Sequence, residues 1–184
     1  MNHRNHLTVP DIERLIAATH GSPTAARDRC LICLMSDQGL RLSEVCSLKL
    51  EHVDLTKREL QVPHYKLGVT PLEEGFIATH PLQSDHLHAL EVWLKERACL
   101  APEGDALFVS EEGLPLNGRA ISNAIKLCGR VAGFDFELHP SMLRIARARE
   151  SSWTPGLQDF LTKPLSIRMT MFYIGKGPLP RASS

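Results

Sequence analysis

The sequence predicts a mainly α-helical domain with one small β-hairpin, a fold of the α+β class. Most segments between glycine and proline breaks carry apolar residues at the three- and four-residue spacing of an amphipathic helix. Two short runs, residues 59–63 and 76–80, have the composition of strands, and the loop between them makes them a hairpin. Helices therefore form most of the fold, and the hairpin forms a short sheet.

The length and composition fit one globular domain. The chain has 184 residues, 43% of them hydrophobic and 23% charged, and a chain of this size buries roughly 70% of its unfolded surface. No apolar run approaches the length of a membrane span, and the first residues lack the apolar core of a signal peptide. We expect a cytoplasmic protein with no membrane contact, a single domain over residues 1–173, and a flexible tail over residues 174–184, which is rich in Gly, Pro and Ser.

Two helices are predicted at the start of the chain. Thr8 is a candidate N-cap, Pro10 follows it, and apolar residues then occupy one face up to residue 16. The second helix begins at Ser22-Pro23 and ends at Gly39. Because this second segment is apolar almost all round, we expect it to be a central, buried helix.

A third helix is predicted directly after Gly39, with Arg41 in its first turn and its end before Val53. The N-terminus of a helix offers unpaired N–H groups, which would add to the guanidinium in receiving a phosphate oxygen. The alternative interpretation is a surface ion pair between Arg41 and Glu44, three residues on.

The middle of the chain is predicted to hold the hairpin and two further helices. A helix capped by Ser84 follows the hairpin, and a short apolar segment covers residues 106–110. Asn117 opens the next helix, which either Gly129 or Gly133 closes.

The last third contains the most basic patch of the sequence. Arg144, Arg147 and Arg149 lie within six residues of each other, and Tyr173 comes after breaks at Pro155 and Pro164. The formal net charge of the whole chain is zero. A balanced charge argues against strong unspecific affinity for nucleic acid, although it permits a local basic groove.

Neither the cysteines nor the histidines predict a metal site or a redox site. The five cysteines are odd in number and lie in apolar stretches, where they resemble small buried hydrophobic residues. His86 and His88 are two residues apart on a predicted helix, so they do not share a face, and solvated surface is the preferred interpretation. We expect no metal and no cofactor.

The order of the motifs resembles that of the catalytic domain of tyrosine recombinases, the phage integrase family. The resemblance runs from Leu7 to Tyr173, and it is strongest to the short invertases of fimbrial phase variation. The motifs are Gly39-Leu40-Arg41-Leu42-Ser43-Glu44, His139-x-x-x-Leu143-Arg144, Leu157-Gln158-Asp159-Phe160-Leu161 and Thr170-x-x-Tyr173.

The resemblance implies four catalytic residues and no cofactor. Tyr173 is the expected nucleophile, which forms a 3′-phosphotyrosyl link with DNA. Arg41 and Arg144 are expected to stabilise charge on the phosphate, and Lys66 to protonate the leaving 5′-oxygen. The implied partners are double-stranded DNA with inverted-repeat sites and other protomers in a synaptic complex.

Several expected helper residues are absent from the sequence. Ser141 stands three residues before Arg144, where the family has a histidine, and Lys163 or Pro164 stands where a second histidine is expected. Lys66 matches the catalytic lysine when the first strand is used for alignment. The second strand places Glu73 and Glu74 there instead.

Three functions therefore remain open. The first is a site-specific recombinase or invertase, with a role in fimbrial phase variation. The second is a catalytically impaired relative that binds DNA or regulates, because loss of one general acid or base commonly costs 10²- to 10⁴-fold in rate. The third is an unrelated helical domain in which Arg41, Arg144 and Tyr173 do not meet.

Overall fold

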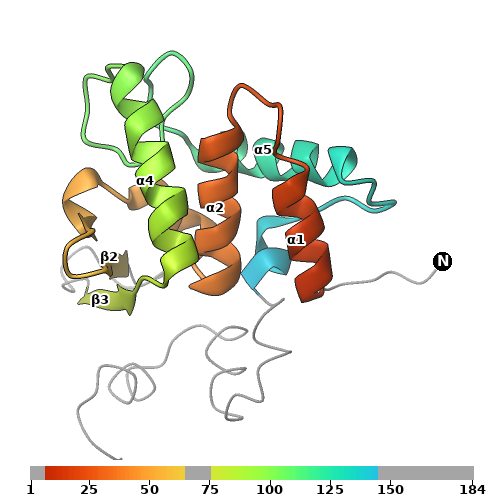
Figure 1. The fold of residues 1–184 in the computed structure, drawn as a ribbon, viewed down its shortest axis with the longest axis horizontal. Helices are drawn as coiled ribbons and strands as arrows, with labels where there is room; N and C mark the ends of the chain where they lie inside the picture. The colour runs from red at the N-terminus through yellow and green to blue at the C-terminus, as the bar shows by residue number, and fades with distance from the viewer. Residues whose placement is uncertain (1–6, 65–75, 145–184) are drawn as a thin grey trace, which may run out of the picture.

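The computed structural model describes residues 7–64 and 76–144, so Lys66, Lys163, Pro164, Tyr173 and the predicted tail lie outside the described residues. The helices are α1 (Val9–Ala17), α2 (Ala25–Asp37), α3 (Leu42–Ser47), α4 (Ser84–Cys99) and α5 (Gly118–Val131), with a 3₁₀ turn, η1, at Leu50–His52 and a further helical segment over residues 140–144. The strands are β1 (Val53–Asp54), β2 (Glu59–His64) and β3 (Phe76–Pro81). Figure 1 confirms the predicted mainly α-helical fold with a short sheet.

The first helix begins where the sequence predicts it. Thr8 is the N-cap of α1: its hydroxyl accepts from the Asp11 N–H at 3.4 Å, and the Asp11 carboxylate accepts from the Thr8 N–H at 2.9 Å. This reciprocal pair satisfies N–H groups that no helical carbonyl reaches. Ile12 and Leu15 are buried on the same helix, which contacts α2.

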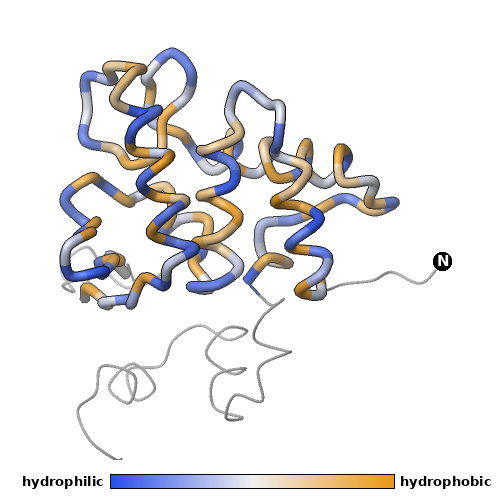
Figure 2. Tube along the Cα trace, in the orientation of Figure 1, coloured by the Kyte–Doolittle hydropathy of each residue, from blue (hydrophilic) through white to orange (hydrophobic). Residues whose placement is uncertain are grey.

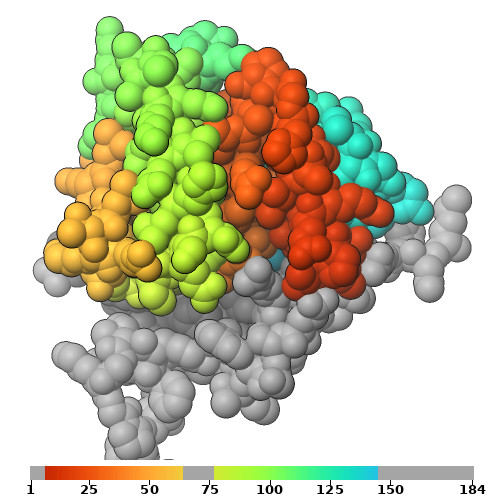
Figure 3. Space-filling model, in the orientation of Figure 1, coloured from red at the N-terminus to blue at the C-terminus, as the bar shows by residue number. Residues whose placement is uncertain are grey.

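The central helix of the fold is α2, as its apolar sequence predicts. It contacts α1, α3, α4 and α5, and every residue from Cys30 to Met35 is buried. Figure 3 shows α1, α2 and α4 side by side on one face, and hydrophobic positions recur along all three in Figure 2. Gly39 follows the helix with φ of 66°, a left-handed conformation that glycine adopts without steric cost.

The sheet is antiparallel, in the order β1-β2-β3, and confirms the predicted hairpin. Leu60 pairs with Val53 on one side and with His80 on the other. Leu60 and Val62 are fully buried and lie two residues apart, so both face the core. The sheet thereby fixes the position of His80 and Pro81 beside the start of α4.

The predicted apolar segment and the last long helix also form. Leu107, Phe108 and Val109 are buried, and the indole N–H of Trp93 on α4 donates to the Leu107 carbonyl at 2.9 Å. Asn117 caps α5 by accepting from the Ala120 N–H at 2.9 Å.

The structure decides between the two glycines predicted to close α5. Gly133 has φ of 74° and lies just beyond the helix, so it is the terminating residue. Gly129 lies inside α5, where a Cβ atom would come within 2.5 Å of Leu138 Cδ1. Gly129 therefore allows close approach of the segment that leads to Arg144.

Two predictions about exposure were wrong in part. His86 was expected at the solvated surface but is buried, with 3% of its surface exposed, because it turns towards the end of α2; His88 is exposed as expected. Cys30, Cys33 and Cys128 are buried as predicted, whereas Cys99 is exposed at the end of α4 and Cys46 is half-buried. Among residues 7–64 and 76–144, none of the helices combines the length and hydrophobicity needed to span a bilayer.

Candidate functional site

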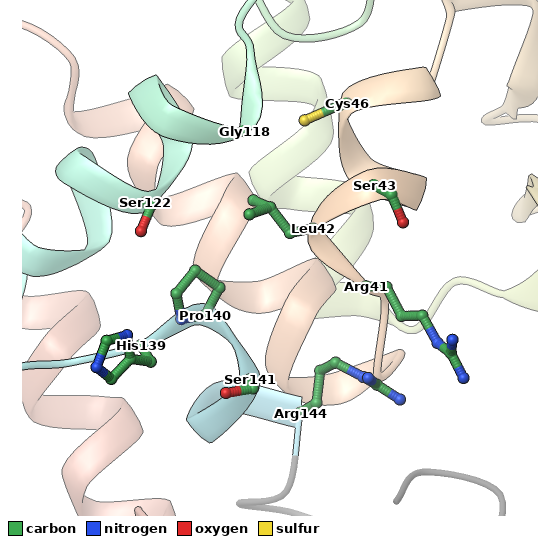
Figure 4. Close-up of a pocket in the computed structure, with 10 residues that line it drawn as sticks. All are labelled: Arg41, Leu42, Ser43, Cys46, Gly118, Ser122, His139, Pro140, Ser141 and Arg144. Carbon is green, nitrogen blue, oxygen red and sulfur yellow. The ribbon is translucent and has the colours of Figure 1, made fainter. Parts of the chain in front are cut away.

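A pocket of about 730 Å³ lies where α3, the start of α5 and residues 139–144 meet. Figure 4 shows it with its lining side chains. Both predicted arginines belong to this lining. The residues are Arg41, Leu42, Ser43, Cys46, Gly118, Ser122, His139, Pro140, Ser141 and Arg144.

Arg41 is held at the start of α3 by Glu44. It is the N-cap residue and precedes the helix, so the prediction that it lies in the first turn was wrong by one position. Its backbone N–H donates to Glu44 Oε2 at 2.7 Å, and its Nε lies 3.9 Å from Glu44 Oε1. The ion pair between Arg41 and Glu44, the alternative interpretation, is therefore present. The Arg41 side chain is nevertheless 29% exposed and lines the pocket.

Arg144 is held by a carbonyl group on the turn that precedes Arg41. Its Nε–H donates to the Gly39 carbonyl oxygen at 2.8 Å. The preceding residues, Met142 and Leu143, are buried and fix the helical segment on the core. The Arg144 side chain lines the pocket and extends on the same side as the Arg41 side chain (Figure 4).

The two guanidinium groups lie close enough to affect each other electrostatically. Burial lowers the pKa of Arg144, and the positive charge of Arg41 lowers it further, while Glu44 acts in the opposite direction. An arginine stays charged despite such a shift. Two like charges with one carboxylate leave a net positive pocket, so an anion that contacts both would be stabilised.

Among the described residues of the lining, the one histidine lies away from the guanidinium pair. In Figure 4, His139 lies on the side of the pocket opposite Arg41, with Pro140 between them. Ser141, at the position of the expected histidine, is exposed and lines the pocket. The described residues thus contain no imidazole beside the two guanidinium groups in this pocket.

The structure brings two of the four predicted site residues together, Arg41 and Arg144. Lys66 and Tyr173 lie outside the described residues. The anchoring role of the Gly39 carbonyl was missed, since no sequence pattern reports which carbonyl a distant arginine reaches. The capping role of Glu44 had a signal, an acidic residue three positions after the N-cap.

No metal site is evident in the ranges that the structure describes. Within them, no group of three or more His, Cys, Asp or Glu residues is placed to hold a metal ion.

Comparison with known proteins identifies curated relatives. The model of the phage integrase family matches residues 5–156. The type 1 fimbriae regulatory protein FimB of Escherichia coli is 35% identical over 175 residues, which cover 92% of this chain and 84% of FimB. FimE, another type 1 fimbriae regulatory protein of Escherichia coli, is 33% identical over 179 residues, covering 94% of this chain and 86% of FimE.

Solved structures share the fold. The XerA recombinase has a TM-score of 0.72 at 21% identity, covering 92% of this chain and 60% of XerA. The XerH site-specific recombinase bound to its difH substrate has a TM-score of 0.67 at 20% identity, covering 92% of this chain and 50% of XerH. The catalytic core of lambda integrase has a TM-score of 0.60 at 22% identity, covering 86% of this chain and 94% of that core.

These matches confirm the resemblance that the motifs suggested and exclude the third alternative, an unrelated helical domain. The match extends over most of the chain and includes both arginines of the pocket. The chain therefore belongs to the phage integrase family, the tyrosine recombinases.

Proposed function

We propose that this protein is a site-specific DNA recombinase that inverts a DNA segment through a 3′-phosphotyrosyl intermediate. The observation that carries the proposal is the convergence of Arg41 and Arg144 on one pocket, with Arg144 anchored to the turn that precedes Arg41. Two guanidinium groups on one pocket match the two oxygens of a phosphodiester that carry its charge.

The arrangement suits the transition state of phosphoryl transfer. As the nucleophile attacks, negative charge grows on the non-bridging oxygens, and fixed donors stabilise it without reorganising. The Gly39 carbonyl accepts from the Nε–H of Arg144, which fixes the orientation of the guanidinium in the pocket lining. Removal of one such donor group typically costs 10²- to 10³-fold in rate.

The remaining steps are assigned to residues outside the described ranges. The Tyr173 hydroxyl attacks the phosphorus, the bond to the 5′-oxygen breaks, and the tyrosine proton leaves to solvent or a base. The 5′-oxygen takes a proton from Lys66 and departs as a hydroxyl. A 5′-hydroxyl of another strand reverses the step and releases the tyrosine, so no external energy source is needed.

The partners of this reaction follow from its chemistry and from the relatives. FimB and FimE are described as regulators of type 1 fimbriae, and XerH is described in complex with its difH substrate. We extend this to the present chain as inversion between two inverted-repeat duplex sites, with a role in fimbrial phase variation. Exchange of four strands requires several protomers in one complex. We infer that the protein acts in the cytoplasm, together with its DNA substrate.

The proposal is tested by trapping the covalent intermediate. Duplexes are first enriched from a random library by binding to the protein, and then rebuilt with a nick that lets the free 5′-fragment diffuse away. We expect wild type to form a protein–DNA adduct that resists detergent. Tyr173→Phe should form none while it retains binding in a gel shift, which separates loss of chemistry from loss of affinity.

A second candidate is a relative that binds DNA but does not cleave it. It is favoured by Ser141 at the pocket edge, where the family has a histidine. This candidate predicts retained duplex binding without any adduct from wild type. A gel shift and the adduct assay on the same duplex therefore decide between the two.

A further inference from the structure

We propose that His86, together with Asp37 and Gln38, is a positioning residue for the arginine pair. These three residues fix the end of α2. The turn that follows carries Arg41 and the carbonyl group that accepts from Arg144. The consequence for catalysis rests on the proposed function. The link between His86 and the turn that positions the two arginines is a property of the folded protein and does not depend on that function.

The hydrogen bonds of His86 determine its tautomer. Its Nδ1 lies 3.2 Å from the Gln83 backbone nitrogen and 3.2 Å from Gln38 Nε2. Both of these groups can only donate, so Nδ1 is an acceptor and carries no proton. The proton is therefore on Nε2, which donates to Asp37 Oδ2 at 2.8 Å. A single buried ring thus connects α4 with two consecutive residues at the end of α2.

The side chain of Gln38 has one orientation for a similar reason. Its Nε2 donates to the Pro81 carbonyl at 2.9 Å, and because that carbonyl only accepts, the amide nitrogen must face it. The opposite oxygen, Oε1, then lies 3.3 Å from His80 Nδ1, which donates. Gln38 is thereby tied both to the end of β3 and to His86.

This network adds side-chain hydrogen bonds that hold the backbone at the end of α2. Helix ends fray, and Gly39 places no side chain to fix its own conformation. Gln38 is the C-cap of α2, and the next peptide unit contains the Gly39 carbonyl that accepts from Arg144. Arg41 lies two residues after Gly39. Movement of Gln38 would therefore shift both guanidinium groups together.

The burial of His86 requires that its ring nitrogens have hydrogen-bond partners. His86 is 3% exposed, and a buried imidazole is stabilised only when its polar atoms are paired. An apolar side chain could fill the same space between α2 and α4. The ring instead directs one donor and one acceptor to the residues that define the turn.

The experiment measures hydrogen exchange of the Arg144 Nε–H by NMR on the full chain, with ¹⁵N-labelled arginine. The hydrogen bond of this group to Gly39 is expected to protect the proton from exchange in wild type. We expect His86→Leu and Asp37→Ala to raise its exchange rate at least about tenfold. His86→Gln, whose amide still donates to Asp37, should keep most of the protection. Thr8→Ala, which removes the cap of α1, is the control for a general loss of stability and should leave the rate unchanged.

The outcomes separate this inference from the proposed function. Unchanged Arg144 protection in His86→Leu would overturn the inference, as would equal acceleration in Thr8→Ala. Should His86→Leu fail to fold, Asp37→Ala decides alone, since it leaves α4 intact. The rate of adduct formation is measured on the same variants. If wild type forms no adduct, the proposed function fails, while the exchange comparison still decides whether His86 positions Arg144.

Discussion

The side chain of Arg144 is bonded to the backbone of Gly39, 105 residues earlier, through an Nε–H···O=C hydrogen bond of 2.8 Å. Gly39 is also the residue that ends α2 and turns the chain towards Arg41. One turn therefore positions both guanidinium groups. Because both arginines depend on this turn, substitutions in the turn and substitutions of Arg144 should both lower the rate of adduct formation.

Arg144→Lys should lower the rate of adduct formation by about 10²-fold or more. A guanidinium can donate to Gly39 and to a phosphate at once, whereas an ammonium on a flexible stem cannot reproduce both bonds in fixed geometry. The rate on the nicked duplex is compared with that of Arg130→Lys, an exposed arginine of α5 outside the pocket lining. Equal rates for Arg144→Lys and wild type would contradict the assigned role.

Gly39→Ala should lower both stability and adduct formation. A left-handed conformation costs a residue with a Cβ about 1–2 kcal/mol, so the turn should relax and the carbonyl that holds Arg144 should move. Gly133→Ala is a matched control, because Gly133 has a similar φ of 74° and open space around a Cβ. Urea unfolding should show comparable losses for the two variants. Only Gly39→Ala should impair the adduct; equal impairment in both would argue against a special role for the turn.

Ser141→His should raise the rate of adduct formation if the chemistry is limited by the missing imidazole. Ser141 is exposed and lines the pocket, so a larger side chain fits without entering the core. A general acid or base contributes about 10²- to 10⁴-fold, and a partly aligned imidazole should give the lower end of that range. The control is Ser122→His, across the same pocket. No gain from Ser141→His would mean that another group already performs this step.

The free energy of unfolding should fall as the pH rises from about 9 to about 11. Burial, followed by the charge of Asp28, raises the pKa of Cys128 from 9.0 to about 11. The unfolded chain therefore releases the thiol proton at lower pH than the folded chain, which favours unfolding across this range. Burial raises the pKa of Cys30 in the same direction. Urea unfolding at a series of pH values should show a slope that Cys128→Ala reduces and Cys99→Ala, at an exposed position, does not.

The local features of the fold were predictable because their signals are local. Thr8 and Asn117 are capping residues directly before their helices, and Gly39 marks the end of α2. The strand pairing of β2 and β3 follows from two short runs of apolar and β-branched residues joined by a loop. Each of these signals acts within a few residues along the chain.

The site was predictable only through the family resemblance, because its contacts are distant in sequence. Nothing in the segments around Arg41 and Arg144 states that the two side chains share a pocket. His86 is a second residue whose contacts could not be predicted from its local sequence. Its spacing to His88 was informative about a metal pair, but its partner is Asp37, 49 residues earlier, so its burial could not be foreseen.

The most direct test of the central claim is a crystal structure of Tyr173→Phe bound to an enriched duplex. Two distances are measured, from the terminal guanidinium nitrogens of Arg41 and of Arg144 to the nearest phosphate oxygens. The account predicts that both arginines contact one phosphate, at about 3 Å each, with the Arg144–Gly39 bond intact. A duplex whose backbone passes outside this pocket, or arginines that contact different phosphates, would contradict it.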